Sequence, residues 1–416
     1  MFRNIKNKYL FLGIALFAIV YCLIEAEGNG DFYIFMWAAG ELSKGLNIYD
    51  HKYNNDYSYY YSVLFALCLK PFYTLSFFWV KFCWLLLNLS LFIHLMVLLI
   101  QSSFYKILSQ QQKNWFLIGV FAFSFRFLHE NIHHAQITIL MLWTCIYGIY
   151  SIYTGRSISG SALLALGINI KLFPLVFIPY LIYRGFFKEV FYVFFFYVLM
   201  MFLPSLFIGH QYNLNMLQSW WLLVNPTKTN HVLDVDERSF HGLSTLLATL
   251  LIEKVPDYYA MSLRRNILDL PYHVFSMVLL FARLFIVSLV LKFLKWPPFK
   301  KQQAGFATKL EIAYILLVIP IIFPHQQHYA FLFATPAFAC AWYYFVLNRN
   351  NMLQAEKTLM IILLSLSFIF CTIKMWLGEF NAYYEHFKIL TYGALLLIPI
   401  LFKVSNGIKQ KAEQDF

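Results

Sequence analysis

The sequence predicts an all-α polytopic membrane protein. Of its 416 residues, 61% are hydrophobic, 20% are aromatic and only 12% are charged, and the mean hydropathy is +0.62. A soluble globule cannot bury so much apolar surface. The apolar residues also come in long runs separated by short polar stretches, and backbone polar groups in hydrocarbon must be satisfied within the segment. The runs are therefore expected to be helices.

The charged residues and cysteines exclude several other classes. The net charge is +12, but the basic residues lie in small groups between apolar runs, as cytoplasmic loop anchors do. Nucleic acid is therefore not an expected partner. The six cysteines fall mostly within apolar runs and form no CxxC pair, which implies neither disulfides nor a thiolate metal site. The first apolar stretch, 9–24, lacks a following cleavage motif, so it is interpreted as an uncleaved helix.

About 12 transmembrane helices are predicted. After 9–24, the apolar runs are 77–101, 115–128, 136–154, 159–183, 186–209, 272–294, 309–323, 329–347, 358–377 and 388–404. The positive-inside rule places both termini in the cytoplasm of a multi-pass protein of the cytoplasmic (inner) membrane. Three regions follow: a membrane module 1–209 with a first outer loop 25–76, an outer (periplasmic) loop 210–271, and C-terminal membrane helices 272–416.

The run 159–183 needs a break at its middle. Basic residues flank it on both sides, at Arg156 and Arg184, and both flanks should be cytoplasmic. Lys171 and Pro174 lie at the centre, where a charge is costly and a proline interrupts a helix. A hairpin of two short helices, with Lys171 at its outer apex, satisfies these constraints. A lysine there suits a phosphate group, and the alternative is a lysine that extends its ammonium to the interface.

Titratable residues concentrate on the predicted outer face. Every histidine except His94 falls at or beyond an outer helix end, and so do most of the 20 acidic residues. The cytoplasmic loops are short and basic and carry no GxxxxGK[ST] or GxGxxG sequence, which disfavours a nucleotide-dependent enzyme on the inner side.

The first outer loop begins EAEGNGDFYIF, with Asp31 directly before an amphipathic segment, 32–42. This segment and 60–69 are too short to span and are predicted to be interfacial helices. Asp31 is suited to N-capping the first of them. It is also a candidate for chemistry, because ionisable groups at membrane depth are often functional.

Two further outer turns carry polar clusters. RFLHENIHHAQ (126–136) holds His129 and His133 at a spacing that allows a metal pair on a helix. No third ligand is evident, so interface hydrogen bonding is the alternative, no metal ligand is assigned, and a divalent metal remains open. FPHQQHYAFLF (323–333) brings His325, His328 and Tyr329 to one turn suited to a polar ligand.

The large outer loop contains Asp234-Val-Asp236, which is similar to the metal-binding D-x-D sequence of nucleotide-sugar enzymes. Nucleotide sugars are not expected on the outer face, so a solvated acidic turn is the favoured interpretation. It also contains SFHGLST, in which His241 precedes a start of small residues. His241 is expected to reach back over the membrane portion.

Four stretches together resemble glycosyltransferase family 87 mannosyltransferases. They are GDFYIFMWAAGELSKGLNIYD, HHAQITIL, GINIKLFPLVFIPYLIYRG and FPHQQHYAFLFATP, in this order over residues 10–345. The resemblance implies a GT-C fold, a polyprenyl-phosphate sugar donor and an aspartate base, carried over to Asp31. The family's G-Q-x-N turn is matched only by Ala135-Gln136-Ile137-Thr138. Its K-x-x-P element corresponds to Lys171–Pro174, and its histidine-tyrosine element to His328-Tyr329.

The function that this resemblance implies is transfer of a hexose, with mannose favoured, from a polyprenyl monophosphate to a lipid or glycan acceptor on the outer face, with inversion. Asp31 is then the general base. Lys171 and Arg126 bind the donor phosphate, and the substrate-binding residues are His133, His134, Gln136, His325, His328 and Tyr329. The alternatives are a transporter or flippase for a lipid-linked glycan and an O-antigen ligase-like enzyme that uses a lipid diphosphate.

Overall fold

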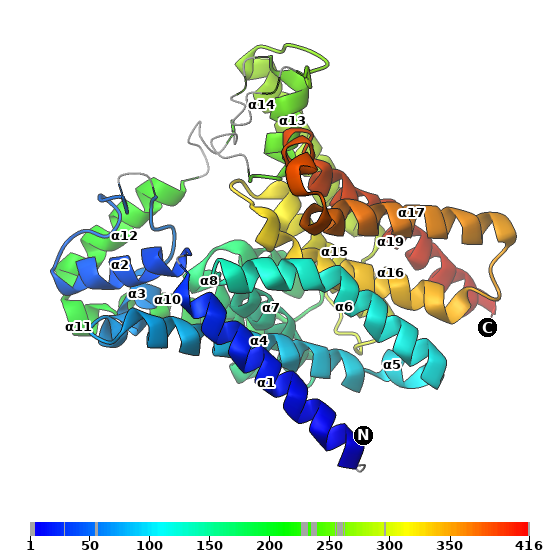
Figure 1. Cartoon of the computed structure of the whole chain (residues 1–416), viewed down its shortest axis with the longest axis horizontal. Helices are drawn as coiled ribbons and strands as arrows, with labels where there is room; N and C mark the ends of the chain where they lie inside the picture. The colour runs from blue at the N-terminus through cyan, green and yellow to red at the C-terminus, as the bar shows by residue number, and fades with distance from the viewer. Residues whose placement is uncertain are drawn as a thin grey trace. The chain divides into compact units, whose positions relative to one another are not determined.

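The structure is a computed structural model that describes residues 5–28, 30–54, 57–225, 232–233, 239–253, 255, 261, 263–294 and 297–414. Within these ranges the chain is helical, and its only β-type pairings are two isolated bridges, Tyr53 with Tyr57 and Phe240 with Gln327. Figure 1 shows the helices along the chain. The predicted all-α class is confirmed. Asp234 and Asp236 lie outside the described residues.

The chain folds into two compact units that alternate along the sequence. The first comprises residues 1–99, 129–175 and 187–225, and the second comprises 100–128, 176–186 and 226–416. The predicted division into 1–209, 210–271 and 272–416 follows membrane topology rather than packing, and it stays a prediction.

The first unit contains the segments around Asp31 and Lys171. Its elements are α1 (Ile5–Glu27), α2 (Phe32–Ser43), α3 (Val63–Leu69), η1 (Lys70–Phe72), α4 (Phe77–Gln101), the end of α6 (Gln110–His133), α7 (Thr138–Tyr153), α8 (Ser157–Ile170), the start of η2 (Phe173–Val176), α10 (Phe187–Phe202), α11 (Ser205–Ile208) and α12 (His210–Val224). The segments predicted as short interfacial helices thus form α2 and α3.

Aromatic packing fixes α2 within this unit. Phe32 and Phe35 are fully buried. The Phe32 ring lies 5.6 Å from the indole of Trp84 in α4, and the Phe35 ring lies 5.3 Å from Phe65 in α3, measured between centroids. Such aromatic contacts dominate the energetics of small cores. The start of α2, which carries Asp31, is therefore held against α3 and α4.

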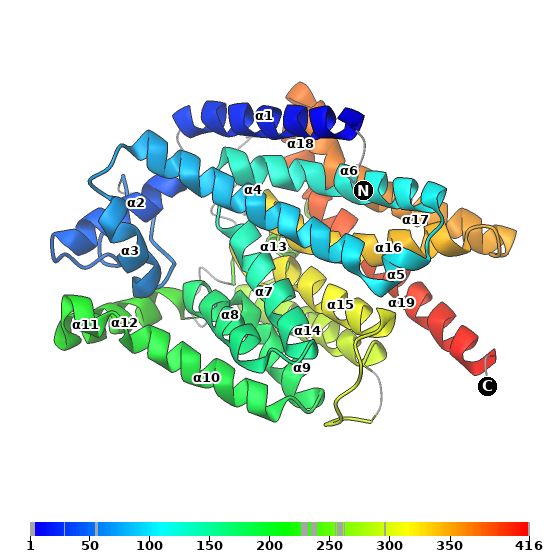
Figure 2. The same cartoon turned by 90° about the horizontal axis from the view of Figure 1, so that it is seen from below.

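Helices α7 and α8 lie side by side (Figure 2) and touch through two glycines. A Cβ atom added to Gly160 would lie 2.6 Å from the carbonyl oxygen of Gly148, and one added to Gly148 would lie 3.1 Å from that of Gly160. Small residues allow such close backbone approach in membrane helices. Because α7 follows the 134–137 turn and α8 ends at Ile170, this contact also fixes the distance between that turn and Lys171.

The second unit is built around packed C-terminal helices. Its elements are α5 (Ser103–Ile107), most of α6, α9 (Phe177–Tyr183), α13 (Leu243–Leu251), α14 (Tyr272–Ser288), η4 (Leu289–Lys292), α15 (Phe306–Ile322), η5 (His328–Ala334), α16 (Thr335–Asn348), α17 (Gln354–Thr372), η6 (Ile373–Trp376), η7 (Gly378–Phe380), α18 (Asn381–His386) and α19 (Ile389–Gln414). Helix α17 packs along α19, and α15 packs along α16.

Six helices in the described residues are long and apolar enough to cross a membrane. They are Phe77–Gln101, Phe187–Ile208, Tyr272–Lys292, His328–Asn348, Gln354–Trp376 and Ile389–Gly407. Shorter apolar helices include Thr138–Tyr153, Ser157–Ile170 and Phe173–Tyr183. The chain is thus a multi-pass membrane protein, whereas the count of about 12 spans and the GT-C arrangement stay predictions.

The predicted break in the run 159–183 is confirmed. Helix α8 ends at Ile170, and Lys171 has an extended backbone, with φ −153° and ψ 133°. Pro174 lies in the short helix η2 that follows. Lys171 therefore lies outside both helices that the apolar run forms.

Candidate active site

Asp31 lies where the chain passes tightly against the turn that follows α6. Its backbone N–H donates a hydrogen bond to the carbonyl oxygen of His134, with an N···O distance of 2.9 Å. The preceding residue, Gly30, has φ +146°, and a Cβ atom there would lie only 2.9 Å from the same carbonyl oxygen. Glycine tolerates both the positive φ and the close approach. The sequence G-D thus allows this contact.

The carboxylate of Asp31 does not cap α2. Asp31 occupies the N-cap position with helical φ and ψ of −65° and −11°, and its side chain makes no capping hydrogen bond. The side-chain amide of Gln136 instead donates to Oδ2 of Asp31. The prediction that the Asp31 side chain caps α2 is therefore wrong, because a capping carboxylate would accept from the N–H groups of its own helix.

Gln136 is almost completely buried, with 1% of its surface exposed. Its backbone N–H donates to the carbonyl oxygen of Asn131 at 2.8 Å, which closes the turn. Its side-chain oxygen has no hydrogen-bond partner among the described residues. A buried amide oxygen in that state usually has a ligand or water to accept from. Gln136 therefore holds Asp31 with its nitrogen and presents an acceptor with its oxygen.

The turn itself is fixed by Ala135 and Trp84. Ala135 has φ +50°, the left-handed conformation that glycine adopts without strain. The indole N–H of Trp84 donates to the carbonyl oxygen of Ala135 at 3.0 Å. A glycine at this position, as in the G-Q-x-N pattern, would adopt this conformation without strain, and Ala135 adopts it here.

Lys171 shares an electrostatic environment with Asp31. Its ammonium lies 4.4 Å from the ring centroid of Phe173 and 5.5 Å from that of Tyr61. Desolvation lowers the pKa of Lys171 to about 8, and the negative charge of Asp31 opposes this change. Burial raises the pKa of the Tyr61 phenol, and the charge of Asp31 raises it further. A carboxylate, a cation and a phenol from three segments of the first unit therefore interact electrostatically.

The other histidines of the 126–136 stretch contact α1. Nδ1 of His133 lies 2.9 Å from a carboxylate oxygen of Glu25, and Nδ1 of His129 lies 2.5 Å from the hydroxyl oxygen of Tyr21. Both histidines of the potential metal pair, His129 and His133, thus contact side chains of α1. His134 contributes its backbone carbonyl to the Asp31 contact, and His133 is largely exposed.

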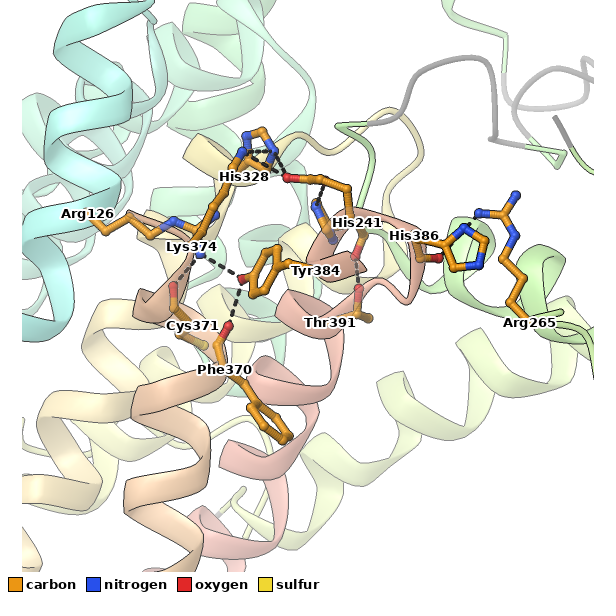
Figure 3. A network of polar contacts seen from close by, with 11 residues as sticks. Arg126, His241, Arg265, His328, Phe370, Cys371, Lys374, Tyr384, His386 and Thr391 are labelled. Atoms are coloured by element: carbon orange, nitrogen blue, oxygen red, sulfur yellow. Dashed lines mark hydrogen bonds and ion pairs between the residues drawn. The ribbon is translucent and has the colours of Figure 1, made fainter. Parts of the chain in front are cut away.

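The remaining predicted site residues, Arg126, His325, His328 and Tyr329, belong to the second unit. Arg126 is 1% exposed, and its Nη1 donates to the carbonyl oxygen of Cys371 at 2.6 Å and to the hydroxyl of Tyr384 at 2.7 Å (Figure 3). Its role in phosphate binding stays a prediction.

His328 belongs to a buried cluster with His241, Glu385 and Lys374. Burial is the main cause that lowers the pKa of His241 to about 3. Burial alone would raise the pKa of Glu385, but the two imidazoles that contact its carboxylate hold that pKa well below its usual range. The cluster therefore places an ionised carboxylate in contact with two imidazoles.

Four residues around Asp31 or in the cluster of the second unit were not predicted from the sequence: Tyr61, Trp84, Lys374 and Glu385. A signal existed for Glu385, because the predicted topology places 378–387 on the outer face with His328 and His241. Tyr61 and Trp84 carry no signal that distinguishes them from the many other aromatic residues of the chain.

The model of glycosyltransferase family 87 matches residues 59–320, more than half of the chain. The chain belongs to glycosyltransferase family 87, and it is thus a membrane glycosyltransferase. No curated protein and no solved structure matches it. The matched range contains Gln136, Lys171 and His241, whereas Asp31 and Glu385 lie outside it.

Proposed function

We propose that the protein transfers a hexose, with mannose as the favoured sugar, from a polyprenyl monophosphate to a lipid or glycan acceptor. The reaction takes place on the outer face of the cytoplasmic membrane and inverts the anomeric configuration. The observation that carries this proposal is the hydrogen bond from Gln136 to the carboxylate of Asp31, with the ammonium of Lys171 in the same electrostatic environment.

Asp31 is the general base. In the transfer, the acceptor hydroxyl loses its proton to the carboxylate as its oxygen bonds to the anomeric carbon, and the bond from that carbon to the phosphate oxygen breaks. General-base catalysis contributes about 10²–10⁴-fold when the base is held within hydrogen-bond reach. The Gln136 amide and the His134 carbonyl supply that positioning, because they fix the side chain and the backbone of Asp31.

Lys171 stabilises the leaving group. The departing polyprenyl phosphate gains negative charge, and a preorganised cation in a partly desolvated site stabilises such charge more than it would in water. With a pKa of about 8, Lys171 is mostly protonated at neutral pH. Arg126, His325, His328 and Tyr329 are further candidates for substrate contacts, and Gln136 offers its amide oxygen to a sugar hydroxyl.

A single carboxylate supports inversion over retention. A retaining enzyme needs a nucleophile that forms a covalent sugar intermediate and a separate acid or base. An inverting transfer needs one base on the face opposite the leaving group. The predicted topology places Asp31, Lys171 and Gln136 in outer segments, where nucleotide sugars are not expected, which supports a lipid-linked donor.

The donor class is tested with membranes that contain the overproduced full-length chain, which also supply the acceptor. Radiolabelled mannose is offered as polyprenyl monophosphate, as polyprenyl diphosphate or as a nucleotide sugar, and polyprenyl-phosphate glucose tests the sugar. We expect transfer from the monophosphate, with mannose preferred, and a product of opposite anomeric configuration by NMR. Transfer only from the diphosphate would support the ligase-like alternative and contradict this proposal.

A further inference from the structure

The buried cluster in the second unit joins three segments that are far apart in the sequence. His241 lies two residues before the start of α13, His328 begins η5, and Glu385 lies in α18. His241 is completely buried, Glu385 is 2% exposed and His328 is 7% exposed. Both imidazoles contact the carboxylate of Glu385 through Nε2, and Figure 3 shows the side chains of His241 and His328 close to each other. Polar groups buried to this extent require specific partners.

The contacts inside the cluster are short. Nε2 of His241 lies 2.7 Å from Oε2 of Glu385, and Nε2 of His328 lies 2.9 Å from Oε1. The ammonium of Lys374 lies 2.9 Å from the same Oε1 and 2.5 Å from Nε2 of His328. The potential ligand atoms of the two histidines and the glutamate all lie within 4.8 Å of one another.

These contacts conflict when their protons are assigned. If Lys374 donates a proton to Nε2 of His328, that nitrogen carries a lone pair and faces the lone pairs of Glu385 Oε1 at 2.9 Å. If Nε2 carries the proton instead, its N–H faces the ammonium at 2.5 Å. Either tautomer leaves one repulsive contact. The conflict disappears when a cation is bound by both lone pairs and Lys374 moves away.

We propose that His241, His328 and Glu385 bind a divalent transition-metal cation through the two Nε2 atoms and the carboxylate, and that Lys374 occupies this position when the metal is absent. Two imidazoles and a carboxylate form a ligand set that zinc commonly uses. Mg²⁺ and Ca²⁺ prefer oxygen ligands, so Zn²⁺ fits best among the common cations. The three ligands belong to the second unit, whereas Asp31 belongs to the first, and the proposal does not depend on the proposed base.

The bound metal would connect the segment before α13, which carries His241, to η5 and α18, which carry His328 and Glu385. The main chain around His241 is already oriented for this role, because its N–H donates to the carbonyl oxygen of Gln326 at 2.8 Å and its carbonyl oxygen accepts from Thr391 at 2.5 Å. Bound metal would thus stabilise the position of residues 241–251 against η5 and α18.

Metal binding is measured on the full-length chain, purified in detergent without an affinity tag and depleted of metal with a chelator. Zn²⁺ is titrated by calorimetry, and Co²⁺ is used as a spectroscopic probe through its visible absorption. We expect one equivalent per chain, and in Glu385→Gln a Kd for Zn²⁺ that is at least about 100-fold weaker, beyond the 10–100-fold effect of an outer partner. Zn²⁺ should also raise the thermal midpoint of the wild type and not that of Glu385→Gln.

Two further variants make the test independent of folding defects. Lys374→Met removes the competing charge, so it should bind Zn²⁺ about tenfold more tightly than the wild type. His133→Gln changes an exposed histidine of the first unit and should leave the affinity unchanged. Weaker binding by Lys374→Met, unchanged binding by Glu385→Gln, or loss of binding by His133→Gln would each overturn the proposal, since the cluster would then be an ion-pair network or the binding would lie elsewhere.

Discussion

The side-chain amide of Gln136 donates a hydrogen bond to Oδ2 of Asp31, across 105 positions of the sequence. This bond connects the turn after α6 to the start of α2. The Asp31 carboxylate makes no capping hydrogen bond to α2 and accepts from Gln136 instead. The proposed base is thus positioned by a residue of the motif that most weakly matched the family pattern.

Gln136 is expected to act as a positioning residue for Asp31. Gln136→Leu should lower kcat by about 10–100-fold with little change in KM, a loss smaller than that expected for removing the base itself. Gln136→Glu places a second carboxyl beside Asp31, so a proton is retained between them to higher pH. The acid limb of its pH–rate profile should therefore move to higher pH. A Gln136→Glu variant with the wild-type profile and rate would contradict this role.

The activity is expected to fall as pH rises through the pKa of Lys171. Folding lowers that pKa from 10.5 to about 8, so the folded protein loses the proton before the unfolded chain does. The cation needed for the leaving group is therefore present below pH 8 and is lost above it, and kcat/KM should show an alkaline limb near pH 8. Bound donor phosphate stabilises the charged form, so the limb of kcat should lie at higher pH.

Two substitutions of Lys171 check the origin of this limb. Lys171→Arg stays charged over the accessible pH range, so the limb should disappear while part of the activity remains. Lys171→Gln should be weakly active at every pH. Persistence of the limb near pH 8 in Lys171→Arg would assign it to another group.

Ala135→Gly is expected to leave the fold intact and to stabilise it by about 0–1 kcal/mol. The left-handed conformation at φ +50° costs an L-residue about 1–2 kcal/mol, and part of this gain is lost to the greater freedom of glycine in the unfolded chain. Ala135→Val, which adds a β-branch in the same conformation, should lower stability. Thermal unfolding in detergent compares the three proteins, and a lower midpoint for Ala135→Gly would contradict this explanation of the turn.

The ion pair between Arg184 and Glu311 should be essential for the thermal stability of the second unit. Both side chains are buried. Nε of Arg184 donates to Oε2 of Glu311 at 3.1 Å, and the hydroxyl of Tyr180 donates to the same oxygen at 3.1 Å. Removing one partner leaves a buried charge, which costs about 3–5 kcal/mol. Arg184→Met and Glu311→Leu should therefore each lower the thermal midpoint strongly.

The double variant Arg184→Met/Glu311→Leu is the control for this prediction. It removes both charges and replaces them with apolar side chains, which is often neutral or stabilising in a core. Its midpoint should exceed that of either single variant. A double variant that is as unstable as the sum of the two single changes would show that the charges act independently.

Local features of this site could be predicted from the sequence, but its pairings could not. The position of Asp31 before a short helix and the helix break at Lys171 follow from charge and proline placement, and both are found. The direction of the Asp31 carboxylate was predicted wrongly, since local spacing favours a cap and only tertiary packing brings Gln136 within reach. The family resemblance identified Gln136 as part of a motif without indicating its partner.

The cluster of the second unit shows the same limit over longer separations. His241 and Glu385 are 144 positions apart, and His328 and Glu385 are 57 apart. The predicted topology places all three on the outer face, which is necessary for their contact and far from sufficient.

The number of spans was also harder to predict than their existence, because hydropathy alone does not determine whether an apolar run forms one full span or a shorter, interrupted helix.

The central claim is that Asp31 is the base of a polyprenyl-phosphate-dependent transfer, and the direct test is the rate of transfer from radiolabelled polyprenyl-phosphate mannose. Membranes with Asp31→Asn are compared with wild type and with Glu27→Gln, which changes an exposed carboxylate nearby. We expect Asp31→Asn to lose about 10²–10⁴-fold in rate at unchanged protein level, and Glu27→Gln to retain the wild-type rate. Full transfer by Asp31→Asn would contradict the assignment of Asp31 as the base.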